Sequence, residues 1–382
     1  MTHSADSRLP RFVETGSDVA RNPSFSLYRS SVDQWLEKRS MRHRSPEVRA
    51  LNLPFEIKAN PDAPYRGRYL LFHGLNDSPY VWQPLASELA KRGFDVRAIL
   101  FDGHGSSPQD MLDVRWEWWL ESAREHLAFW REDNVPMFLG GFSMGAVIAT
   151  WLALDNPEID GLLLISPAFK SRLNRYLRWS GLYARFRPWV FGGMIREDNP
   201  IKYNSVPVNS GWQYFQLTQG LKRRWSRKDH LDMPALMVMT EDDSVVSAAY
   251  TKKLFTRRFT ASGSRLLSYS ADPMGFAALK ASDGDERMVY RSSFFPEKRI
   301  LNQSHLGLMY PPDNVLFGER SEILVCNGNE YAVFSACVGS SRHWYGAQHT
   351  PSPDDVPVAR TTYNADWHAM LELMDEVLLA TP

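Results

Sequence analysis

The sequence has few of the features that mark specialised classes of protein. Its 382 residues hold only two cysteines, 44 basic residues against 44 acidic ones, and no uninterrupted apolar run of about 18 residues. Two cysteines are too few for a disulfide framework, and the charge balance gives no reason to expect nucleic acid as a partner. The missing apolar run argues against a transmembrane segment. With 43% hydrophobic residues, the chain can bury a large core.

The start of the chain and the two cysteines bear on the compartment. Residues 1–8 show no basic region followed by an apolar stretch, so we predict no secretory signal and expect the cytoplasm. Cys326 and Cys337 flank the turn residues Asn327, Gly328 and Asn329, a pattern that predicts a β-hairpin. We expect them to be buried or half-buried thiols that pack, with a bridged pair as the alternative.

Four short apolar runs each end at a turn rich in glycine or in serine and proline. They are residues 69–72, 96–101, 137–139 and 161–165, and amphipathic helical stretches at 80–92, 115–131 and 144–154 lie between them. Strands that are apolar throughout and alternate with helices indicate a mostly parallel sheet with helices on both faces. In such sheets ligands bind at the carboxyl ends of the strands. A site is therefore expected in the turns that follow these runs.

The alternation stops after Phe169. Residues 170 to about 228 are rich in Tyr, Trp, Phe and Arg, and a buried strand is predicted again at 234–239. We interpret the interruption as a helical cap inserted over the strand ends. The aromatic side chains of the cap either form a pocket for an apolar substrate group or pack the cap onto the core. The basic aromatic stretch from Arg172 to Arg187 is either a solvated face or a surface for transient contact with a membrane. Further helices are predicted at 26–42 and 365–379.

The strongest motif is Gly141-Phe142-Ser143-Met144-Gly145. It matches GxSxG and lies between an apolar strand and an apolar helix, the context that this motif needs. The glycines allow neighbouring chains to approach while the serine hydroxyl stays exposed on a tight strand-to-helix turn. We therefore predict that Ser143 is a nucleophile rather than a structural serine.

A serine nucleophile needs a histidine base and an acid that orients the histidine, in the chain order Ser, acid, His. The loop after 234–239 offers the acids Glu241, Asp242 and Asp243. His305 lies just beyond an apolar run that follows Arg299, and we interpret that run as strand-like. His343 and His349 lie in a polar loop, His368 in the last helix and His104 in a turn before the serine. These positions favour His305 as the base.

The oxyanion of an acyl-transfer reaction needs two hydrogen-bond donors. One is the backbone N–H of the residue after the nucleophile, here Met144, and the other comes from the loop after an earlier strand. The turn that begins at His73 and Gly74 is that loop, and Leu75 is the predicted second donor.

These motifs and their order resemble the α/β-hydrolase superfamily, and within it the branch of monoacylglycerol lipases and lysophospholipases. The matching pieces are His73-Gly74 with Asn76-Asp77-Ser78, Phe101 to Ser107, Gly141 to Gly145, and Thr240 to Val246. The resemblance implies the α/β-hydrolase fold with an inserted helical cap, selects Asp243 over Asp242 as the acid, and implies a lipid-like ester as substrate. Two departures are Thr240 in place of glycine and the span of about sixty residues from Asp243 to His305, roughly twice the usual one. Strand-like runs at 264–269 and 287–291 fill that span and predict a sheet with an enlarged edge.

The resulting expectation is a carboxylic ester hydrolase that works through Ser143, His305 and Asp243 without a metal or organic cofactor, on a small-molecule ester with an apolar acyl group. We divide the chain into an N-terminal extension (1–60), a first core part (61–169), a cap insertion (170–230) and a second core part (231–382). The alternatives are a thioesterase, acyltransferase or peptidase on the same residues, an inactive scaffold relative, and a lipid binder at the membrane surface.

Overall fold

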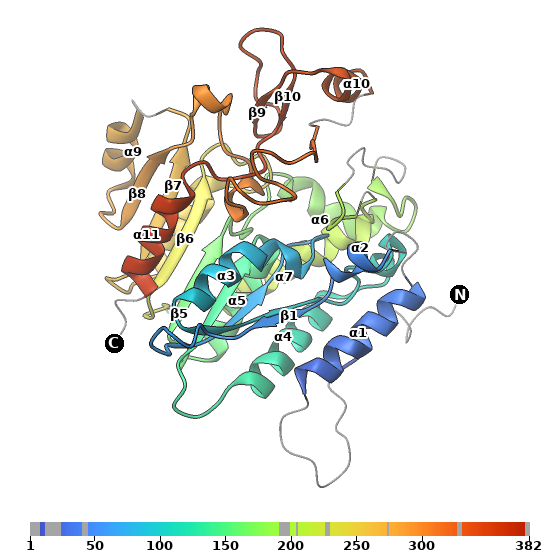
Figure 1. The fold of residues 1–382 in the computed structure, drawn as a ribbon, viewed down its shortest axis with the longest axis vertical. Helices are drawn as coiled ribbons and strands as arrows, with labels where there is room; N and C mark the ends of the chain where they lie inside the picture. The colour runs from blue at the N-terminus through green and yellow to red at the C-terminus, as the bar shows by residue number, and fades with distance from the viewer. Residues whose placement is uncertain are drawn as a thin grey trace. The chain divides into compact units, whose positions relative to one another are not determined.

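The computed structural model describes residues 8–11, 24–39, 45–190, 199–203, 205–225, 230–272, 275–326 and 331–378. Contacts between residues are concentrated within two compact units of the chain. The first comprises residues 1–159, 174–194 and 200–225, and the second comprises residues 160–173, 195–199 and 226–382. Figure 1 shows the path of the chain with the labels used below.

The first unit holds four strands, β1 (Phe55–Ile57), β2 (Gly67–Phe72), β3 (Phe94–Ile99) and β4 (Met137–Phe142). Their order is β1-β3-β2-β4, with β2 parallel to both neighbours and β1 antiparallel to β3. Because β3 and β4 flank β2 on opposite sides, the winding reverses at β2, which makes the carboxyl ends of β2 and β4 a topological switch point. The strands predicted at 69–72, 96–101 and 137–139 are confirmed, while β1 has no counterpart in the sequence analysis.

The helices before the cap are α1 (Phe25–Arg39), α2 (Pro46–Ala50), α3 (Gln83–Lys91), α4 (Trp116–Trp130) and α5 (Met144–Asp155), with 3-10 turns at Pro79–Trp82 and Pro108–Leu112. Every residue of α5 from Met144 to Ala153 is buried. A helix that is apolar on all sides is stable only inside a protein, so α5 is fixed at the centre of this unit. The predicted helices at 80–92, 115–131 and 144–154 are confirmed, as is the one at 26–42 within its described part.

The cap helices α6 (Asn174–Tyr183) and α7 (Val208–Arg224) also belong to the first unit. Small residues let α7 approach its neighbours closely: a Cβ at Gly220 would lie 2.8 Å from the ring of Trp151 on α5, and one at Gly181 of α6 would lie 2.5 Å from the ring of Trp212 on α7. Asn209 also donates from its Nδ2 to the carbonyl of Val114 at 3.0 Å. The stretch predicted as an inserted cap is thus helical within its described residues.

The second unit is built on β5 (Gly161–Ile165), β6 (Ala235–Thr240), β7 (Arg265–Ser270) and β8 (Met288–Ser292), all parallel and in the order β5-β6-β7-β8. Its helices include α8 (Ala248–Arg258), α9 (Phe276–Asp283) and α11 (Trp367–Leu378), with 3-10 turns at Pro296–Lys298 and Gly307–Met309. These bounds confirm the strands predicted at 161–165, 234–239, 264–269 and 287–291 and the helix predicted at 365–379. The mostly parallel sheet with helices is therefore confirmed.

Both cysteines are buried, and the structure shows the bridged pair that was the alternative, whereas the predicted free thiols and the predicted hairpin are wrong. Cys326 and Cys337 form a disulfide with their Cα atoms 5.9 Å apart. The backbone of Cys326 forms an isolated antiparallel β-bridge with Ala359 and not with a hairpin partner. Cys337 lies in helix α10 (Tyr331–Gly339). The run after the turn is apolar at every position from 331 to 334, which suits a helix as well as a strand. Residues 327–329 lie outside the described residues.

The segment around this disulfide carries two short parallel strands, β9 (Trp344–Gly346) and β10 (Val358–Arg360). Cys326, Cys337 and Ala359 form a small buried cluster against which Leu324, Phe334 and Tyr345 pack. The disulfide thus ties α10 to Cys326, and Cys326 in turn forms a β-bridge with Ala359 of β10. Across the described parts of the chain, no helix has the length and apolar character needed to cross a membrane.

Candidate active site

Ser143 occupies a sharp turn between β4 and α5. Its backbone φ is 54°, in the left-handed region that residues other than glycine rarely adopt and that is often found at functional sites. The flanking glycines are needed for the turn, because a Cβ at Gly141 would lie 2.3 Å from the Cα of Ala146 and one at Gly145 would lie 2.0 Å from the carbonyl oxygen of Phe72. The backbone therefore presents Ser143 at the carboxyl end of β4 in a strained conformation.

The turn after β2 lies directly beside this serine. A Cβ on Gly74 would be only 3.2 Å from the Cβ of Ser143, so the two turns pack against each other. His73 fixes the start of the turn, with Nδ1 2.8 Å from the carbonyl of Gly74 and Nε2 accepting from the N–H of Phe101 at 3.1 Å. Burial, together with the neighbouring His104, lowers the pKa of His73 well below its usual value. His73 is therefore a neutral structural ring.

The predicted oxyanion donors, Leu75 and Met144, directly follow the two residues that approach each other here, Gly74 and Ser143. Leu75 follows Gly74 on the β2 turn, and Met144 is the first residue of α5, where the backbone N–H has no acceptor within the helix. After Leu75 the chain passes through Asn76 with a φ of 57°. The buried Asp77 next to it accepts from the N–H of Ser78 at 3.0 Å and lies 3.2 Å from the ammonium of Lys202. These contacts hold the turn in one conformation.

In the second unit, the structure brings together Asp243 and His305. The Nδ1 of His305 lies 2.6 Å from Oδ2 of Asp243, whose side chain is 1% exposed. The other oxygen, Oδ1, accepts from the backbone N–H groups of Val245 at 2.7 Å and Val246 at 2.9 Å. Because a carboxylate at this position accepts from Nδ1, the Nε2 of the ring is the atom left to receive a proton in chemistry.

The two neighbouring acids have other partners. Asp242 accepts from the N–H of Ala271 at 3.3 Å, and burial raises its pKa. Glu241 accepts from the Oγ of Ser268 at 2.7 Å and pairs with the ammonium of Lys252 at 3.0 Å. Of the three acids in the loop, Asp243 is the one that contacts His305.

His305 does not end a strand, and the strand-like interpretation of the apolar run before it is wrong. Ile300 makes only isolated bridges, and residues 301–304 form an irregular loop. Hydrogen bonds to distant segments hold the loop: Ser304 Oγ donates to the carbonyl of Thr361 at 2.6 Å, and the carbonyl of His305 accepts from Ser166 Oγ at 2.8 Å. Gln303 also donates to the carbonyl of Tyr363 at 3.1 Å.

The sequence did not predict that residues 361–363 and Ser166 hold this loop. Ser166 directly follows β5 and has a φ of 45°. The available signal was its place in a turn at a strand end, beside Pro167. Residues 361–363 carry no comparable signal, because they contribute mainly backbone carbonyls.

The other candidate histidines have structural partners or lie on the surface. His104 is completely buried, its Nδ1 lies 3.1 Å from the carbonyl of Asp102, and burial lowers its pKa to about 4. His343 places Nε2 2.7 Å from the carbonyl of Cys337. His368 is exposed on α11. None of them replaces His305 beside Asp243.

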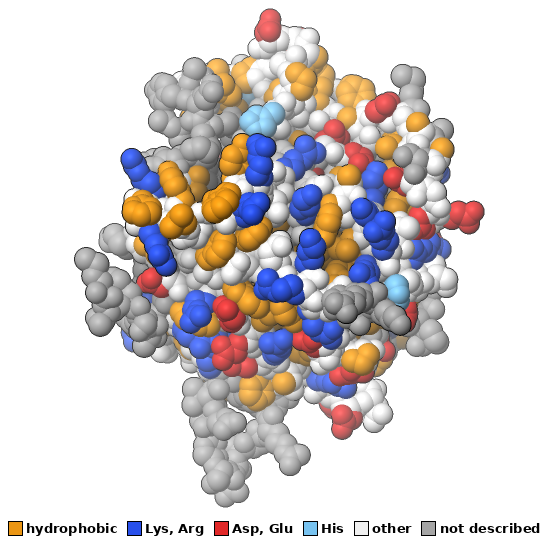
Figure 2. Space-filling model, turned by 180° about the vertical axis from the view of Figure 1, so that it is seen from behind, with side chains coloured by type: hydrophobic (Ala, Val, Ile, Leu, Met, Phe, Trp, Pro, Cys, Tyr) orange, Lys and Arg blue, Asp and Glu red, His pale blue; other side chains and the backbone are white. Residues whose placement is uncertain are grey.

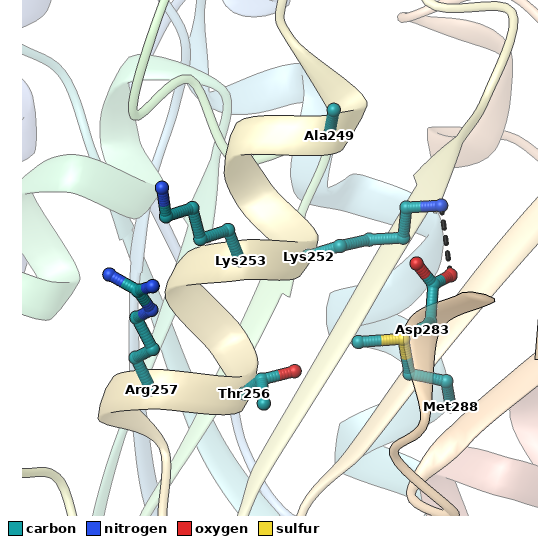
Figure 3. Close-up of a pocket in the computed structure, with 7 residues that line it drawn as sticks. All are labelled: Ala249, Lys252, Lys253, Thr256, Arg257, Asp283 and Met288. Atoms are coloured by element: carbon teal, nitrogen blue, oxygen red, sulfur yellow. Dashed lines mark hydrogen bonds and ion pairs between the residues drawn. The ribbon is translucent and has the colours of Figure 1, made fainter.

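A cavity of about 390 Å³ lies elsewhere in the second unit, beside α8. Figure 3 shows Lys252 reaching from α8 toward Asp283, whereas Lys253 and Arg257 leave the helix on its other side. The ammonium of Lys252 is neutralised by Asp283 at 2.9 Å and by Glu241 at 3.0 Å. The cavity therefore has a structural ion-pair network at its wall and no contact with Asp243 or His305.

A mostly parallel sheet, a strained serine between a strand and a buried helix, and a later Asp–His pair define the class of α/β-hydrolases of the serine type. Residues 63–270, more than half of the chain, match the family model described as serine aminopeptidase, S33. The chain belongs to this family.

Similar proteins of known activity include lipases. The thermostable monoacylglycerol lipase of Bacillus sp. (strain H-257) is 26% identical over 179 residues, which cover 46% of this chain and 70% of that enzyme. Among solved structures, one from the metagenome-derived lipolytic enzymes LipS and LipT has a TM-score of 0.49 at 21% identity, covering 56% of this chain and 86% of that one. A soluble variant of the Saccharomyces cerevisiae monoglyceride lipase has a TM-score of 0.47 at 18% identity, with coverages of 60% and 88%.

Proposed function

We propose that this protein is a carboxylic ester hydrolase in which Ser143, His305 and Asp243 act as a catalytic triad. The observation that carries the proposal is the 2.6 Å contact between Nδ1 of His305 and Oδ2 of Asp243. An imidazole held in this way by a buried carboxylate is the base that a serine nucleophile requires. The strained turn at Ser143 and the chain order Ser, Asp, His support the same assignment.

The proposed reaction has two halves. In the first, Nε2 of His305 takes the hydroxyl proton, Oγ of Ser143 attacks the ester carbonyl, and the N–H groups of Leu75 and Met144 stabilise the oxyanion. The bond from the carbonyl carbon to the alcohol oxygen then breaks, and His305 returns the proton to the leaving alcohol. In the second, His305 takes a proton from water as the water oxygen attacks the acyl carbon. The bond from that carbon to Oγ of Ser143 then breaks, His305 returns the proton to Oγ, and the carboxylic acid leaves.

The substrate class that we propose is a small ester with an apolar, lipid-like acyl group. The likeness to a monoacylglycerol lipase supports it. In this mechanism Asp243 does not change protonation, and no step needs a metal or an organic cofactor. Binding of the acyl group rests on burial of apolar surface, so a longer chain binds more tightly until the pocket is filled.

A fluorophosphonate probe and a series of p-nitrophenyl esters of increasing acyl length test the proposal. We expect covalent labelling that Ser143→Ala abolishes, and ester turnover that rises with acyl length to a maximum. The matched control is Ser321→Ala, which removes a partly buried serine hydroxyl that bonds only within its own loop in the contacts described and should leave labelling intact. Labelling that persists in Ser143→Ala would contradict the assigned nucleophile.

A peptidase is the second candidate, because the matching family model is described as a serine aminopeptidase. The same triad can cleave an amide if the leaving amine is protonated by His305. Aminoacyl p-nitroanilides distinguish the two candidates. Labelling together with anilide turnover, and without turnover of any ester in the series, would favour the peptidase.

A further inference from the structure

Helix α6 and the turn after it expose an unusual set of large apolar side chains. The exposed fractions are 63% for Tyr176, 62% for Trp179, 58% for Leu182, 56% for Tyr183 and 76% for Phe186. Within the described residues, four of the six exposed aromatic side chains lie in these eleven positions, the other two being Tyr65 and Phe294. We call these five residues the α6 aromatic face.

The α6 aromatic face is not needed to pack the helix. The opposite face of α6 makes that contact: Ser180 is buried, Gly181 lies against the ring of Trp212, and Leu177 lies against Gly211 of α7. Tyr176, Trp179 and Tyr183 follow one another on the outer side at intervals of three and four residues, which form one stripe of a helix, and Phe186 lies in the turn that follows α6. An exposed stripe of this size marks an interaction surface.

The charge around the stripe has one sign. Arg175, Arg178, Arg185 and Arg187 are all exposed, and the sequence has no Asp or Glu from residue 170 to residue 196. Two of the arginines lie over the rings of the stripe, Arg175 at 5.1 Å from the centroid of Tyr176 and Arg178 at 5.2 Å from that of Trp179. Figure 2 shows hydrophobic and basic side chains interleaved over the part of the surface that includes α6, with few acidic ones.

We propose that the α6 aromatic face and its arginines bind the surface of an anionic phospholipid bilayer. Tyr and Trp side chains are enriched where headgroups meet hydrocarbon, because each combines an apolar ring with a polar tip. Arginines next to such a stripe are attracted to the negative potential of anionic lipids. A membrane satisfies both features at once, since the stripe enters the interface while the arginines remain at the phosphates. The helix lies in the interface and does not span the bilayer.

This binding goes beyond the proposed hydrolysis and does not depend on it. None of the residues of the α6 aromatic face belongs to the proposed triad or to the oxyanion donors. Ser143→Ala is therefore expected to bind bilayers like the unaltered protein. A failure of the hydrolase proposal and a failure of the membrane proposal are thus distinguishable.

Flotation with lipid vesicles tests the proposal. The full chain is mixed with vesicles of phosphatidylcholine alone or of phosphatidylcholine with one quarter phosphatidylglycerol, at low and at high salt. We expect binding to the anionic vesicles at 50 mM NaCl to be roughly several hundredfold tighter than to neutral vesicles, because each of the four arginines adds roughly fivefold. At 500 mM NaCl most of this difference should disappear, since salt screens surface charge.

Two variants assign the binding to the surface described. R175Q/R178Q/R185Q/R187Q should lose most of the preference for anionic lipid, and Y176S/W179S/F186S should reduce binding to both kinds of vesicle at least tenfold. The matched control K222Q/R223Q/K253Q/R257Q, which neutralises four exposed cations elsewhere in the chain, should keep binding within about threefold. Circular dichroism and urea denaturation check that each variant is folded.

Three results would overturn the proposal. They are absence of vesicle binding at low salt, equal binding to neutral and anionic vesicles, and an equal loss of binding in the control variant. If the protein did not bind vesicles at low salt, the α6 aromatic face would instead be interpreted as a surface that binds another protein.

Discussion

The carboxylate of Asp243 is held in one orientation while it contacts His305. Its Oδ2 lies 2.6 Å from Nδ1 of the imidazole, and its Oδ1 accepts two backbone N–H bonds at 2.7 and 2.9 Å from Val245 and Val246. The side chain cannot turn away from the ring without leaving buried donors without an acceptor, which costs free energy. This arrangement fixes the tautomer as well as the orientation of His305.

The first prediction concerns the acid. Asp243→Asn leaves the shape of the side chain nearly unchanged, but the amide cannot stabilise the imidazolium or select the same tautomer. We expect kcat for p-nitrophenyl esters to fall by about 10⁴-fold with KM little changed. Asp242→Asn is the matched control next to it in the chain, and its kcat should stay within about threefold. Similar losses in the two variants would contradict the assignment of Asp243.

The second prediction concerns the loop that carries His305. Ser304→Ala removes the donor to the carbonyl of Thr361 and the acceptor for the N–H of Gly307. We expect kcat to fall about tenfold or more, because a small displacement of the imidazole weakens proton transfer, and stability to fall by about 1–2 kcal/mol. KM should change little, since Ser304 is proposed to position His305 and not to bind substrate.

Ser321→Ala is the matched control for this effect. The Ser321 hydroxyl donates to the carbonyl of Leu316 and accepts from the N–H of Ile323, a pair of bonds of the same kind in another loop. Urea denaturation should show a comparable loss of stability, whereas kcat should be unchanged. If both variants lowered kcat equally, the position of Ser304 beside His305 would have no special importance.

The sequence was sufficient for those elements whose pattern is local and strong. Strand β4 and helix α5 were predictable because a short apolar run, a glycine-rich turn and a second, longer apolar run follow each other without interruption. The serine turn was predictable for the same reason, as it needs glycines at two fixed positions, 141 and 145. In both cases the residues that specify the structure lie within about fifteen positions of each other.

The rest depends on contacts between distant segments. The loop of His305 is shaped by hydrogen bonds to Ser166, Thr361 and Tyr363, which lie about 60 to 140 positions away and mostly contribute carbonyl groups. No side-chain pattern records such contacts. The disulfide was foreseen only as an alternative, and the hairpin prediction failed because the Asn-Gly turn after Cys326 favours a hairpin, while the structure pairs Cys326 with Ala359. Strand β1 has only three residues, too few for a periodicity to be recognised.

The third prediction concerns the glycine that lets α5 approach β2. In Gly145→Ala the new methyl group would lie 2.0 Å from the carbonyl oxygen of Phe72, which is backbone and cannot move aside. We expect a loss of at least about 3 kcal/mol in stability together with loss of ester turnover. Gly339→Ala is the control, because a Cβ there meets no atom within 4 Å. Its stability, measured by urea denaturation, should change by less than about 1 kcal/mol.

The last prediction is the pH dependence of stability caused by His104. Burial lowers the pKa of this imidazole from 6.5 to about 4, and it is 0% exposed. A histidine whose pKa is lower in the folded state binds its proton preferentially in the unfolded state. Its contribution to stability is therefore complete above pH 6.5 and is lost as the pH falls toward 4.

Between pH 7.5 and pH 5, this single group should reduce the free energy of unfolding by about 2 kcal/mol. In His104→Gln that contribution disappears, so the variant should show a pH dependence about 2 kcal/mol smaller over the same range, whatever its stability at pH 7.5. His368→Gln, which alters an exposed imidazole on α11, should keep the full dependence. Urea denaturation of the three proteins at both pH values measures the difference, and an unchanged dependence in His104→Gln would show that His104 is not the residue responsible.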